Sequence, residues 1–221
     1  MNLSKSYEFF QPENDTARIH IVGCGSVGST VAENLVRCGV TNLTLWDFDT
    51  VEAHNVANQM FRQQDVGRLK VEALYDILFD INPEIAGRVK LESKGWQGKN
   101  MSGYIVLAVD NIDLRREIIE QHMNSIFVKA VFDVRTGLTD AQHFAADWAD
   151  KKQKEALLNS MQFSHEEVKD AVSACGVTLG VVTTVRLISA ICVNNYIKFT
   201  KGEGIWKFCQ VDGFAGIMDC F

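Results

Sequence analysis

The feature that most constrains the fold of this chain is a glycine-rich loop between an apolar run and a helix-like segment. The run over residues 17–23, "ARIHIVG", ends in glycine, and residues 26–40 then place apolar side chains at helical spacing. We expect that helix to end at Gly39, a typical C-cap residue. Residues 42–49, "NLTLWDFD", alternate like a strand and end in acids, so the sequence predicts a βαβ unit.

The same alternation of strand-like and helix-like segments continues along the chain. We predict helices over residues 70–84 and 114–125 and buried strands over 103–111 and 126–134. Strands that alternate with helices indicate an α/β fold with a Rossmann-like, doubly wound and mainly parallel sheet covered by helices on both faces. Ligands of such sheets bind at the carboxyl ends of the strands.

The last third of the sequence is less regular. Residues 146–161 and 164–174 are charged and are predicted to be exposed helix or loop, whereas residues 178–199 are apolar enough for a long buried helix. Residues 204–221 are rich in aromatic side chains, and Asp212-Gly213 is a turn signal. The sequence therefore predicts a closing C-terminal β-hairpin.

Length and composition favour one compact domain. A chain of 221 residues that is 47% hydrophobic can bury a substantial core. We expect a single domain over residues 1–221, with a nucleotide-binding core over 17–136 and a helical segment and closing strands over 137–221.

Charge and terminal sequence limit the partners that we expect. The net charge is -6 and no block of Lys or Arg is present, which argues against nucleic acid and an anionic membrane as partners. The first residues lack the apolar core of a signal peptide, and no window reaches the roughly 18 apolar residues of a membrane span. We expect a cytoplasmic protein.

The cysteines show no C-x-x-C spacing, which argues against a structural zinc site and against a disulfide framework. We expect most of them to be buried, reduced thiols. They are Cys24, Cys38, Cys175, Cys192, Cys209 and Cys220.

The glycine loop has the G-x-G-x-x-G spacing of a nucleotide site. Gly23, Gly25 and Gly28 allow backbone amides and a helix N-terminus to approach phosphate, with Ser26 at the start of that helix. Asp47 follows about twenty residues later, where an acid takes the ribose hydroxyls. The alternative is a glycine turn that only permits tight packing of strand and helix.

The residues after Asp47 favour ATP over a redox dinucleotide. Residues 47–70 form a dense polar segment that ends in Lys70, which a dehydrogenase does not need. Nucleotidyl transfer needs a cation near the α-phosphate, donors for phosphate oxygens and an acid to hold Mg²⁺. A NAD-linked dehydrogenase is a distant alternative because no catalytic His or Tyr-x-x-x-Lys pattern accompanies the glycine loop.

Four segments together resemble the ThiF-type adenylyltransferases. These are "GCGSVGSTVAENLVRCGV", "LWDFDTVEAHNVANQ", "DVGRLKVEAL" and "AVDNIDLRREI", in the family's order and near its spacing within residues 17–120. The family includes bacterial thiamine and molybdopterin sulfur-carrier activators and the adenylation domains of ubiquitin-activating enzymes. The resemblance implies a Rossmann-like fold, usually homodimeric. It also implies joining of the C-terminal carboxylate of a small ubiquitin-like or sulfur-carrier protein, typically ending Gly-Gly, to AMP from ATP.

The resemblance also implies roles for the polar segment. Asp47 would accept hydrogen bonds from the ribose, and Asp49 would brace the same loop, unless it is only a strand-end acid. Asn55 and Gln59 match residues that hold phosphate oxygens, with local turn capping as the alternative.

Two charged residues further along match the family's catalytic groups. Lys70 matches the lysine on the triphosphate, with a solvated helix lysine as the alternative. Asp110 matches the magnesium-associated aspartate, although a strand-end Asp is often a helix N-cap. Asn111 is expected to support the same turn and to join the nucleotide contacts.

The chain departs from the family pattern in ways that bear on catalysis. Asn58 stands where relatives carry arginine in N-x-x-R-Q, and it brings no charge to a polyphosphate. Arg62, one turn further on, is the candidate to replace that charge. Relatives often donate an arginine from an amino-terminal helix to the partner subunit, but only Lys5 and Arg18 are basic before the first strand.

Two further residues have open roles in the sequence. Cys175, in "SACGV", lies near where some relatives keep a functional cysteine and is a candidate to take over the activated carboxyl. A buried, inert thiol is the alternative. Arg135 is either a surface ion-pair partner or a substrate contact.

Two functions from different classes therefore stay open. The first is an ATP-dependent adenylyltransferase. The second is a catalytically degenerate ThiF-like protein that binds nucleotide or serves as a dimeric partner. Lys70, Asp47 and Asp110 favour the enzyme, and Asn58 favours the second function.

Overall fold

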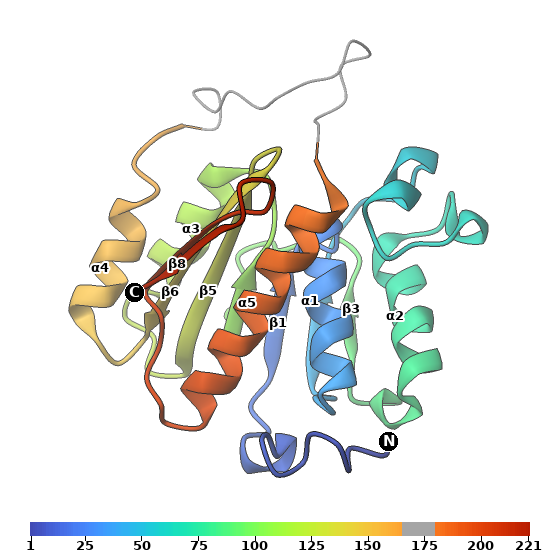
Figure 1. The fold of residues 1–221 in the computed structure, drawn as a ribbon, viewed down its shortest axis with the longest axis horizontal. Helices are drawn as coiled ribbons and strands as arrows, with labels where there is room; N and C mark the ends of the chain where they lie inside the picture. The colour runs from blue at the N-terminus through green and yellow to red at the C-terminus, as the bar shows by residue number, and fades with distance from the viewer. Residues whose placement is uncertain (165–179) are drawn as a thin grey trace.

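The computed structural model describes residues 1–164 and 180–221 as one eight-stranded sheet with helices on both faces (Figure 1). The strands are β1 (Ile19–Val22), β2 (Leu43–Trp46), β3 (Lys90–Glu92), β4 (Gly103–Leu107), β5 (Val128–Thr136), β6 (Asp140–Asp147), β7 (Phe208–Asp212) and β8 (Ile217–Cys220). The helices are α1 (Ser26–Arg37), α2 (Lys70–Ile81), α3 (Ile112–His122), α4 (Lys151–Asn159) and α5 (Val182–Thr200). Short 3-10 helices are η1 (Pro12–Asn14), η2 (Ala53–Ala57), η3 (Gln63–Asp65) and η4 (Pro83–Ile85).

The sheet has the strand order β3-β2-β1-β4-β5-β6-β7-β8. The first five strands in the sequence are parallel, and β6, β7 and β8 continue the sheet in antiparallel fashion. The chain order reverses between β1 and β4, which is where ligands bind in open α/β sheets. The predicted Rossmann-like, mainly parallel sheet with a C-terminal hairpin is confirmed.

The core lies in two layers, one on each face of the sheet. Apolar residues of α1, α2 and α5 form one buried cluster against the sheet, and those of α3 and α4 form the other. Figure 1 shows α1 and α5 side by side along one face. The hydrophobic strands β1, β2 and β4 are buried on both faces, as strands between two helical layers must be.

The predicted end of the first helix is confirmed. Gly39 follows the C-cap of α1 with φ +89°, and its N–H donates to the carbonyl of Val36. The N–H of Val40 donates to the carbonyl of Leu35, which completes the turn. The positive φ of Gly39 is a conformation that other residues rarely adopt, so the position favours glycine.

Two strands differ from the sequence-based expectation. β6 continues to Asp147, so helix or loop was wrong for the first two of residues 146–161, whereas α4 confirms a helix over Lys151–Asn159. β6 pairs with β5 on one side and β7 on the other, and this pairing overrides weak local propensity. β3 has only three residues, of which two are exposed, and no hydrophobic pattern marks it.

The remaining C-terminal predictions can be compared for the described residues. The long buried helix predicted over 178–199 is confirmed from Val182 onward. Of the predicted segment 164–174, residues 165–174 lie outside the described residues. In the part of the chain that the structure describes, no helix combines the length and apolar character that crossing a bilayer requires.

Candidate functional site

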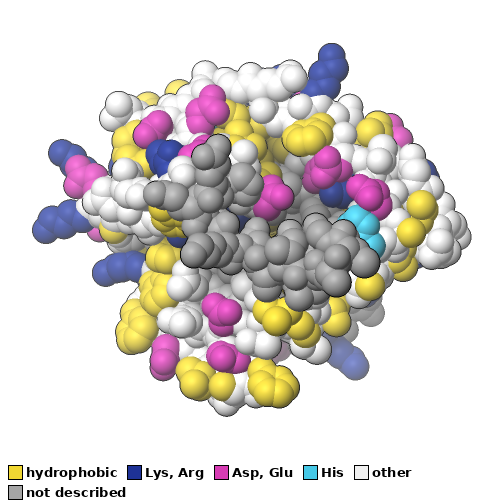
Figure 2. All heavy atoms as spheres, turned by 90° about the horizontal axis from the view of Figure 1, so that it is seen from above, with side chains coloured by type: hydrophobic (Ala, Val, Ile, Leu, Met, Phe, Trp, Pro, Cys, Tyr) yellow, Lys and Arg dark blue, Asp and Glu magenta, His cyan; other side chains and the backbone are white. Residues whose placement is uncertain are grey.

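A cavity of about 920 Å³ opens at the carboxyl ends of β1, β2, β4 and β5. Figure 2 looks onto this edge of the molecule and shows Lys and Arg side chains projecting mainly from its periphery. Most of the residues singled out in the sequence line this cavity. They are Gly23, Gly25, Ser26, Asp47, Asp49, Asn55, Asn58, Gln59, Lys70, Asp110, Asn111 and Arg135.

The three glycines of the loop serve two different purposes. A Cβ on Gly28 would lie 1.8 Å from the carbonyl oxygen of Gly23, and a Cβ on Gly23 would lie 2.7 Å from that of Ala108. These two glycines therefore allow the loop to pack against α1 and β4. Apart from its chain neighbours and the backbone of α1, no atom of residues 1–164 and 180–221 lies within 4 Å of a Cβ built on Gly25, which leaves open space at the cavity wall.

The start of α1 faces the same space. Gly25 is the N-cap and has no side chain, so the N-cap residue makes no side-chain hydrogen bond to the first N–H groups of the helix. Ser26 and Val27 line the cavity beside it. An uncapped helix N-terminus next to a glycine that leaves room is suited to an anion such as phosphate.

Asp47 is fixed against the glycine loop. Its Oδ2 accepts the N–H of Cys24 at 2.7 Å, and its Oδ1 accepts the N–H of Asp49 at 2.8 Å. Burial raises the pKa of the Asp47 carboxyl, although these two hydrogen bonds oppose the shift. The carboxylate therefore has a fixed position at the end of β2, with lone pairs left for hydroxyl donors.

Lys70 and Asp49 form an ion pair at the cavity wall. Lys70 Nζ lies 2.8 Å from Asp49 Oδ2, and the Lys70 side chain is only 10% exposed. Lys70 is the first residue of α2, whereas Asp49 follows β2. The lysine is therefore not a solvated surface residue, and Asp49 holds it beside the cavity.

The amides of the polar segment differ in their environment. Asn55 Oδ1 accepts the N–H of Glu52 and caps η2. This contact is the local turn capping that the sequence left open as the alternative role of Asn55. Asn58 Oδ1 and Gln59 Oε1 are buried and have no hydrogen-bond partner in the part of the chain that the structure describes. Unpaired buried polar atoms are costly, so these two amides at the cavity wall are suited to a polar ligand.

Asp110 and Asn111 differ in their contacts: one caps a helix, and the other leaves its side chain free of hydrogen bonds within the described residues. Asn111 Oδ1 accepts the N–H groups of Asp113 and Leu114 and is the N-cap of α3. Asp110 is exposed, and within the described residues no hydrogen bond or ion pair engages its carboxylate. The capping function thus belongs to Asn111, which leaves the Asp110 carboxylate available.

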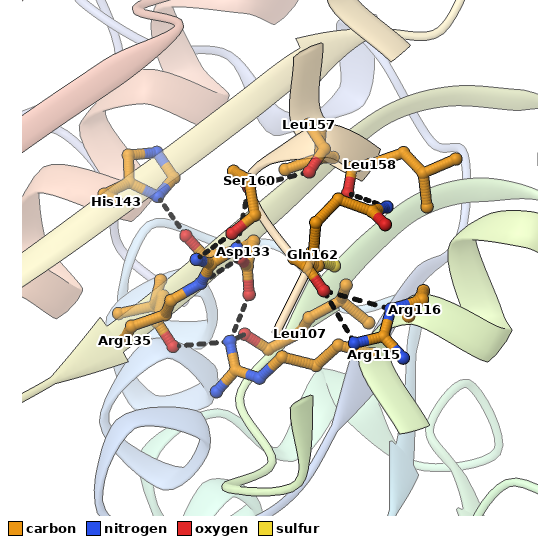
Figure 3. A network of polar contacts seen from close by, with 12 residues as sticks. Leu107, Arg115, Arg116, Asp133, Arg135, His143, Leu157, Leu158, Ser160 and Gln162 are labelled. Carbon is orange, nitrogen blue, oxygen red and sulfur yellow. Dashed lines mark hydrogen bonds and ion pairs between the residues drawn. The ribbon is translucent and has the colours of Figure 1, made fainter. Parts of the chain in front are cut away.

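A buried ion cluster supports the wall formed by β4 and β5 (Figure 3). Asp133, fully buried, pairs with Arg115 and lies 2.7 Å from Arg135 Nη2. Arg115 also donates to the carbonyls of Val109 and Val134, which tie the end of β5 to the residues before Asp110. Arg135 is therefore a partly buried ion-pair partner of Asp133, and it also lines the cavity.

Three predicted basic residues lie elsewhere or make other contacts. Arg62 binds Asp65 and Asp80 and does not line the cavity. Arg18 donates to the carbonyls of Leu43 and Arg88, at the opposite ends of the strands. Lys5 is exposed and is not part of the cavity wall, and Cys175 lies outside the described residues.

Sequence reasoning missed several residues of the cavity wall. Lys94 and Trp96 follow β3, and no strand was predicted there, so nothing in the sequence placed them at the carboxyl edge. Phe48 lies between the two acids of "DFD", is 68% exposed and packs beside Gly95. An apolar residue between two acids at the end of a strand was the available signal for Phe48.

The chemistry that the wall permits follows from its groups. An uncapped helix N-terminus, a buried lysine and two unpartnered amides are suited to a polyphosphate, and Asp47 is suited to hydroxyl groups. No group of three or more His, Cys, Asp or Glu residues within residues 1–164 and 180–221 is arranged to hold a metal ion. Mg²⁺ is commonly held by one or two carboxylates together with phosphates, and Asp110 offers one such carboxylate.

Comparisons with known proteins bear on the family of the chain. The sequence model of the ThiF family matches residues 7–216. The ubiquitin-like modifier-activating enzyme 5 of Oryza sativa subsp. japonica is 36% identical over 125 residues, which cover 49% of this chain and 30% of that protein. The corresponding enzyme of Arabidopsis thaliana is 46% identical over 67 residues, which cover 30% and 16%. The chain thus matches less than a third of the length of these relatives.

Solved structures share the fold. E. coli MccB crystallised with MccA-N7isoASN gives a TM-score of 0.74 at 16% identity and covers 95% of this chain and 66% of MccB. E. coli MccB with ATP gives 0.71 at 16% identity, covering 95% and 65%. PaaA gives 0.69 at 17% identity, with the same coverage of 95% and 65%. At these identities the likeness concerns the fold alone.

Proposed function

The chain belongs to the ThiF family, and from this premise we propose that it is an ATP-dependent adenylyltransferase. The acceptor is the C-terminal carboxylate of a small ubiquitin-like or sulfur-carrier-like protein ending in Gly-Gly, and the product is its acyl-AMP. The names of the curated relatives, which activate a ubiquitin-like modifier, support this acceptor class.

One observation carries the proposal: a single cavity brings together the glycine loop, Asp47, Lys70 and Asp110. These groups lie far apart in the sequence and come from β1, β2, α2 and the end of β4. A structural role for the glycine loop accounts for Gly23 and Gly28, but it does not account for the open space at Gly25 or for a buried lysine in the wall of the same cavity.

The residues fit ATP in both size and chemistry. A cavity of about 920 Å³ lies within the range for small-molecule sites. The N-terminus of α1 and Lys70 would hold the phosphates, Asp47 the ribose, and the amides of Asn58 and Gln59 the adjoining oxygens. Asp110 would hold Mg²⁺, which supplies neutralisation of phosphate charge when bound.

The chain's own residues would then stabilise the charge that develops on the phosphate and keep the reacting groups in position. Lys70 stabilises negative charge that develops around the α-phosphorus as the acceptor carboxylate attacks and pyrophosphate leaves. Asp49 keeps the lysine in place, and the ties of Arg115 to the carbonyls of Val109 and Val134 keep the end of β4 in place. The low exposure of Lys70 strengthens its effect, because charges interact more strongly away from water.

Asn58 supports the second candidate function, a catalytically degenerate nucleotide-binding or dimeric partner. Its amide brings hydrogen-bonding capacity without charge, in contrast to the arginine of relatives. For Arg62 to supply the missing charge, its guanidinium would have to leave Asp65 and Asp80. Homodimerisation, cytoplasmic location and transfer of the acyl group to Cys175 stay predictions of the family resemblance and the sequence.

The test is ATP–pyrophosphate exchange measured with candidate carrier proteins. We expect carrier-dependent exchange that is lost in Lys70→Ala and in Asp110→Ala. Lys151→Ala and Asp219→Ala are matched controls on exposed residues outside the cavity and should retain exchange. ATP binding without exchange for any carrier would favour the degenerate partner.

A further inference from the structure

Two of the cysteines lie directly opposite each other in the C-terminal hairpin. In the antiparallel register of β7 and β8, Cys209 pairs with Cys220. Phe208 and Phe221, the neighbouring pair, exchange N–H to carbonyl hydrogen bonds in both directions. Because hydrogen-bonded and non-hydrogen-bonded pairs alternate along antiparallel strands, Cys209 and Cys220 form a non-hydrogen-bonded pair, whose side chains lie close together.

The separation of such a pair suits a disulfide. Opposite residues of non-hydrogen-bonded pairs have Cα atoms about 4.5 Å apart. The Cα atoms of disulfide-bonded cysteines are roughly 4.4–6.8 Å apart, so this separation lies at the short end of that range. Their side chains also point to the same face of the sheet. The register of the hairpin therefore places the two cysteines at a separation that a disulfide can span.

The two thiols share one environment but differ in access to solvent. Cys209 is fully buried, and Cys220 is half-buried and packs against the same core. Burial, followed by a hydrogen bond with the Cys220 thiol, raises the pKa of Cys209. The side chains therefore contact each other, and Cys220 is the member of the pair that an oxidant in solution can reach.

We propose that Cys209 and Cys220 form a reversible cross-strand disulfide when the protein meets a glutathione-class disulfide oxidant. This modification site is independent of the adenylyltransferase proposal, since neither cysteine lines the cavity at the strand ends. It goes beyond the expectation that most of the cysteines are buried, reduced thiols, because that expectation came from spacing along the sequence and not from strand register.

The reaction proceeds by two exchanges and needs no other reactant. The Cys220 thiolate attacks one sulfur of glutathione disulfide, forms a mixed disulfide and releases one glutathione thiolate. Cys209 then loses its proton to solvent and attacks the Cys220 sulfur, which releases the second glutathione. Two protein thiols are oxidised to one disulfide as one glutathione disulfide is reduced to two thiols. Because burial disfavours the Cys209 thiolate, the second exchange is the slow one.

A third thiol provides the competing pairing. Cys192, on α5, is buried in the same core cluster as Cys209. It lies on a helix that packs on the sheet and not on a paired strand, so no register places it opposite Cys209. The strand pairing therefore favours Cys220 as the partner.

The disulfide would hold the last strand at the edge of the sheet. β8 pairs only with β7, and its other edge carries no strand in the described structure. The bond joins the open end of the hairpin, opposite its turn at residues 213–216. Amide hydrogen exchange of β8 should accordingly be slower in the oxidised protein than in the reduced protein.

Mass spectrometry of the full chain tests the proposal directly. The reduced protein is equilibrated with glutathione disulfide and glutathione, quenched with N-ethylmaleimide and digested with trypsin. Residues 208–221 contain both cysteines and no internal Lys or Arg, so they form one peptide. We expect this peptide to lose both maleimide groups and two hydrogens, with at least about tenfold more cross-link in the native protein than in guanidinium chloride.

Three variants separate the alternatives. Cys192→Ser should leave the cross-link unchanged, whereas Cys220→Ser should abolish it. Cys209→Ser should stop the reaction at a glutathione adduct on Cys220. The proposal is overturned if wild-type protein yields only that adduct, if Cys209 links to Cys192, or if the unfolded chain cross-links as readily as the native one.

Discussion

Lys70 Nζ lies 2.8 Å from Asp49 Oδ2, and the backbone N–H of Lys70 donates to the carbonyl of Asp49 at 2.9 Å. The two residues thus join the end of β2 to the start of α2 through both side chain and backbone. The polar segment between them closes on itself, since Thr50 and Leu69 form an antiparallel bridge. Asp49 consequently determines where the lysine lies relative to the glycine loop.

The first prediction concerns this ion pair. Asp49→Ala should lower the turnover of ATP–pyrophosphate exchange by roughly 10- to 100-fold while ATP affinity changes little, because the lysine keeps its charge but loses its position. Asp49→Asn keeps an oxygen for Lys70 and should have a smaller effect. The idea fails if Asp49→Ala weakens ATP binding and leaves turnover unchanged.

The second prediction compares two glycines three residues apart. Gly28→Ala should destabilise the fold by about 3 kcal/mol, because its Cβ would lie 1.8 Å from the Gly23 carbonyl oxygen. Gly25→Ala has open space and a φ of -73°, so its unfolding free energy should change by less than about 1 kcal/mol. It should nevertheless weaken ATP binding by filling the cavity wall.

Urea denaturation and ATP titration calorimetry on both variants measure these effects. Gly28→Ala serves as the structural reference, since its loss of stability needs no ligand. If Gly25→Ala binds ATP as tightly as the wild type, the phosphates of ATP do not lie against Gly25.

The sequence predicts features that depend on neighbouring residues better than features that depend on pairing between distant segments. The positions of Gly23, Asp47 and Lys70 at the carboxyl edge of the sheet could be predicted because glycine spacing, strand-end acids and the family pattern are local signals. Lys94 was not found, because it follows a three-residue exposed strand that only pairing with β2 creates. β6 was missed for the same reason: its neighbours in the sheet, and not its own composition, make it a strand.

The ion cluster and the cysteine pair show the same limit. Asp133, Arg115 and Arg135 are ordinary charged residues in the sequence, and only the folded sheet reveals that Asp133 is fully buried between two guanidinium groups. Cys209 and Cys220 become neighbours through strand register. Pairing between residues that are far apart in the chain produces no periodic pattern that a single sequence would reveal.

The third prediction concerns the charge at Asp133. Asp133→Ala should destabilise the protein by about 3–5 kcal/mol, because it leaves the buried Arg115 and the partly buried Arg135 without their counter-ion. Asp76→Ala breaks a half-exposed pair with Arg68 and should cost less than about 1 kcal/mol. Thermal and urea unfolding of the two variants would contradict this account if their stabilities were alike.

The fourth prediction restores charge in the cavity. Asn58→Arg should increase the rate of carrier-dependent exchange, since guanidinium can bind phosphate oxygens that an amide leaves unneutralised. Asn58→Gln, which adds length without charge, is the matched control. Equal rates in both variants would show that charge at this position does not limit the reaction.

The last prediction concerns acid sensitivity, which should come from two buried histidines. Burial lowers the pKa of His20 and of His143 to about 4, and each ring is hydrogen-bonded through both nitrogens. In the unfolded chain these histidines become protonated near pH 6.5. In the native protein they stay neutral until the pH falls to about 4. Their contribution to stability is therefore fully present above pH 6.5 and is lost as the pH falls toward 4.

Urea unfolding between pH 7.5 and pH 5 measures this loss. The free energy of unfolding should fall by about 2 kcal/mol per histidine by pH 5, because each remains neutral in the native state while its unfolded counterpart is protonated. His143→Gln keeps an amide that can donate to the Asp133 carbonyl and accept from Asn195, and it removes one titrating group. The pH slope of this variant should therefore decrease by about one proton, and an unchanged slope would assign the acid sensitivity to other groups.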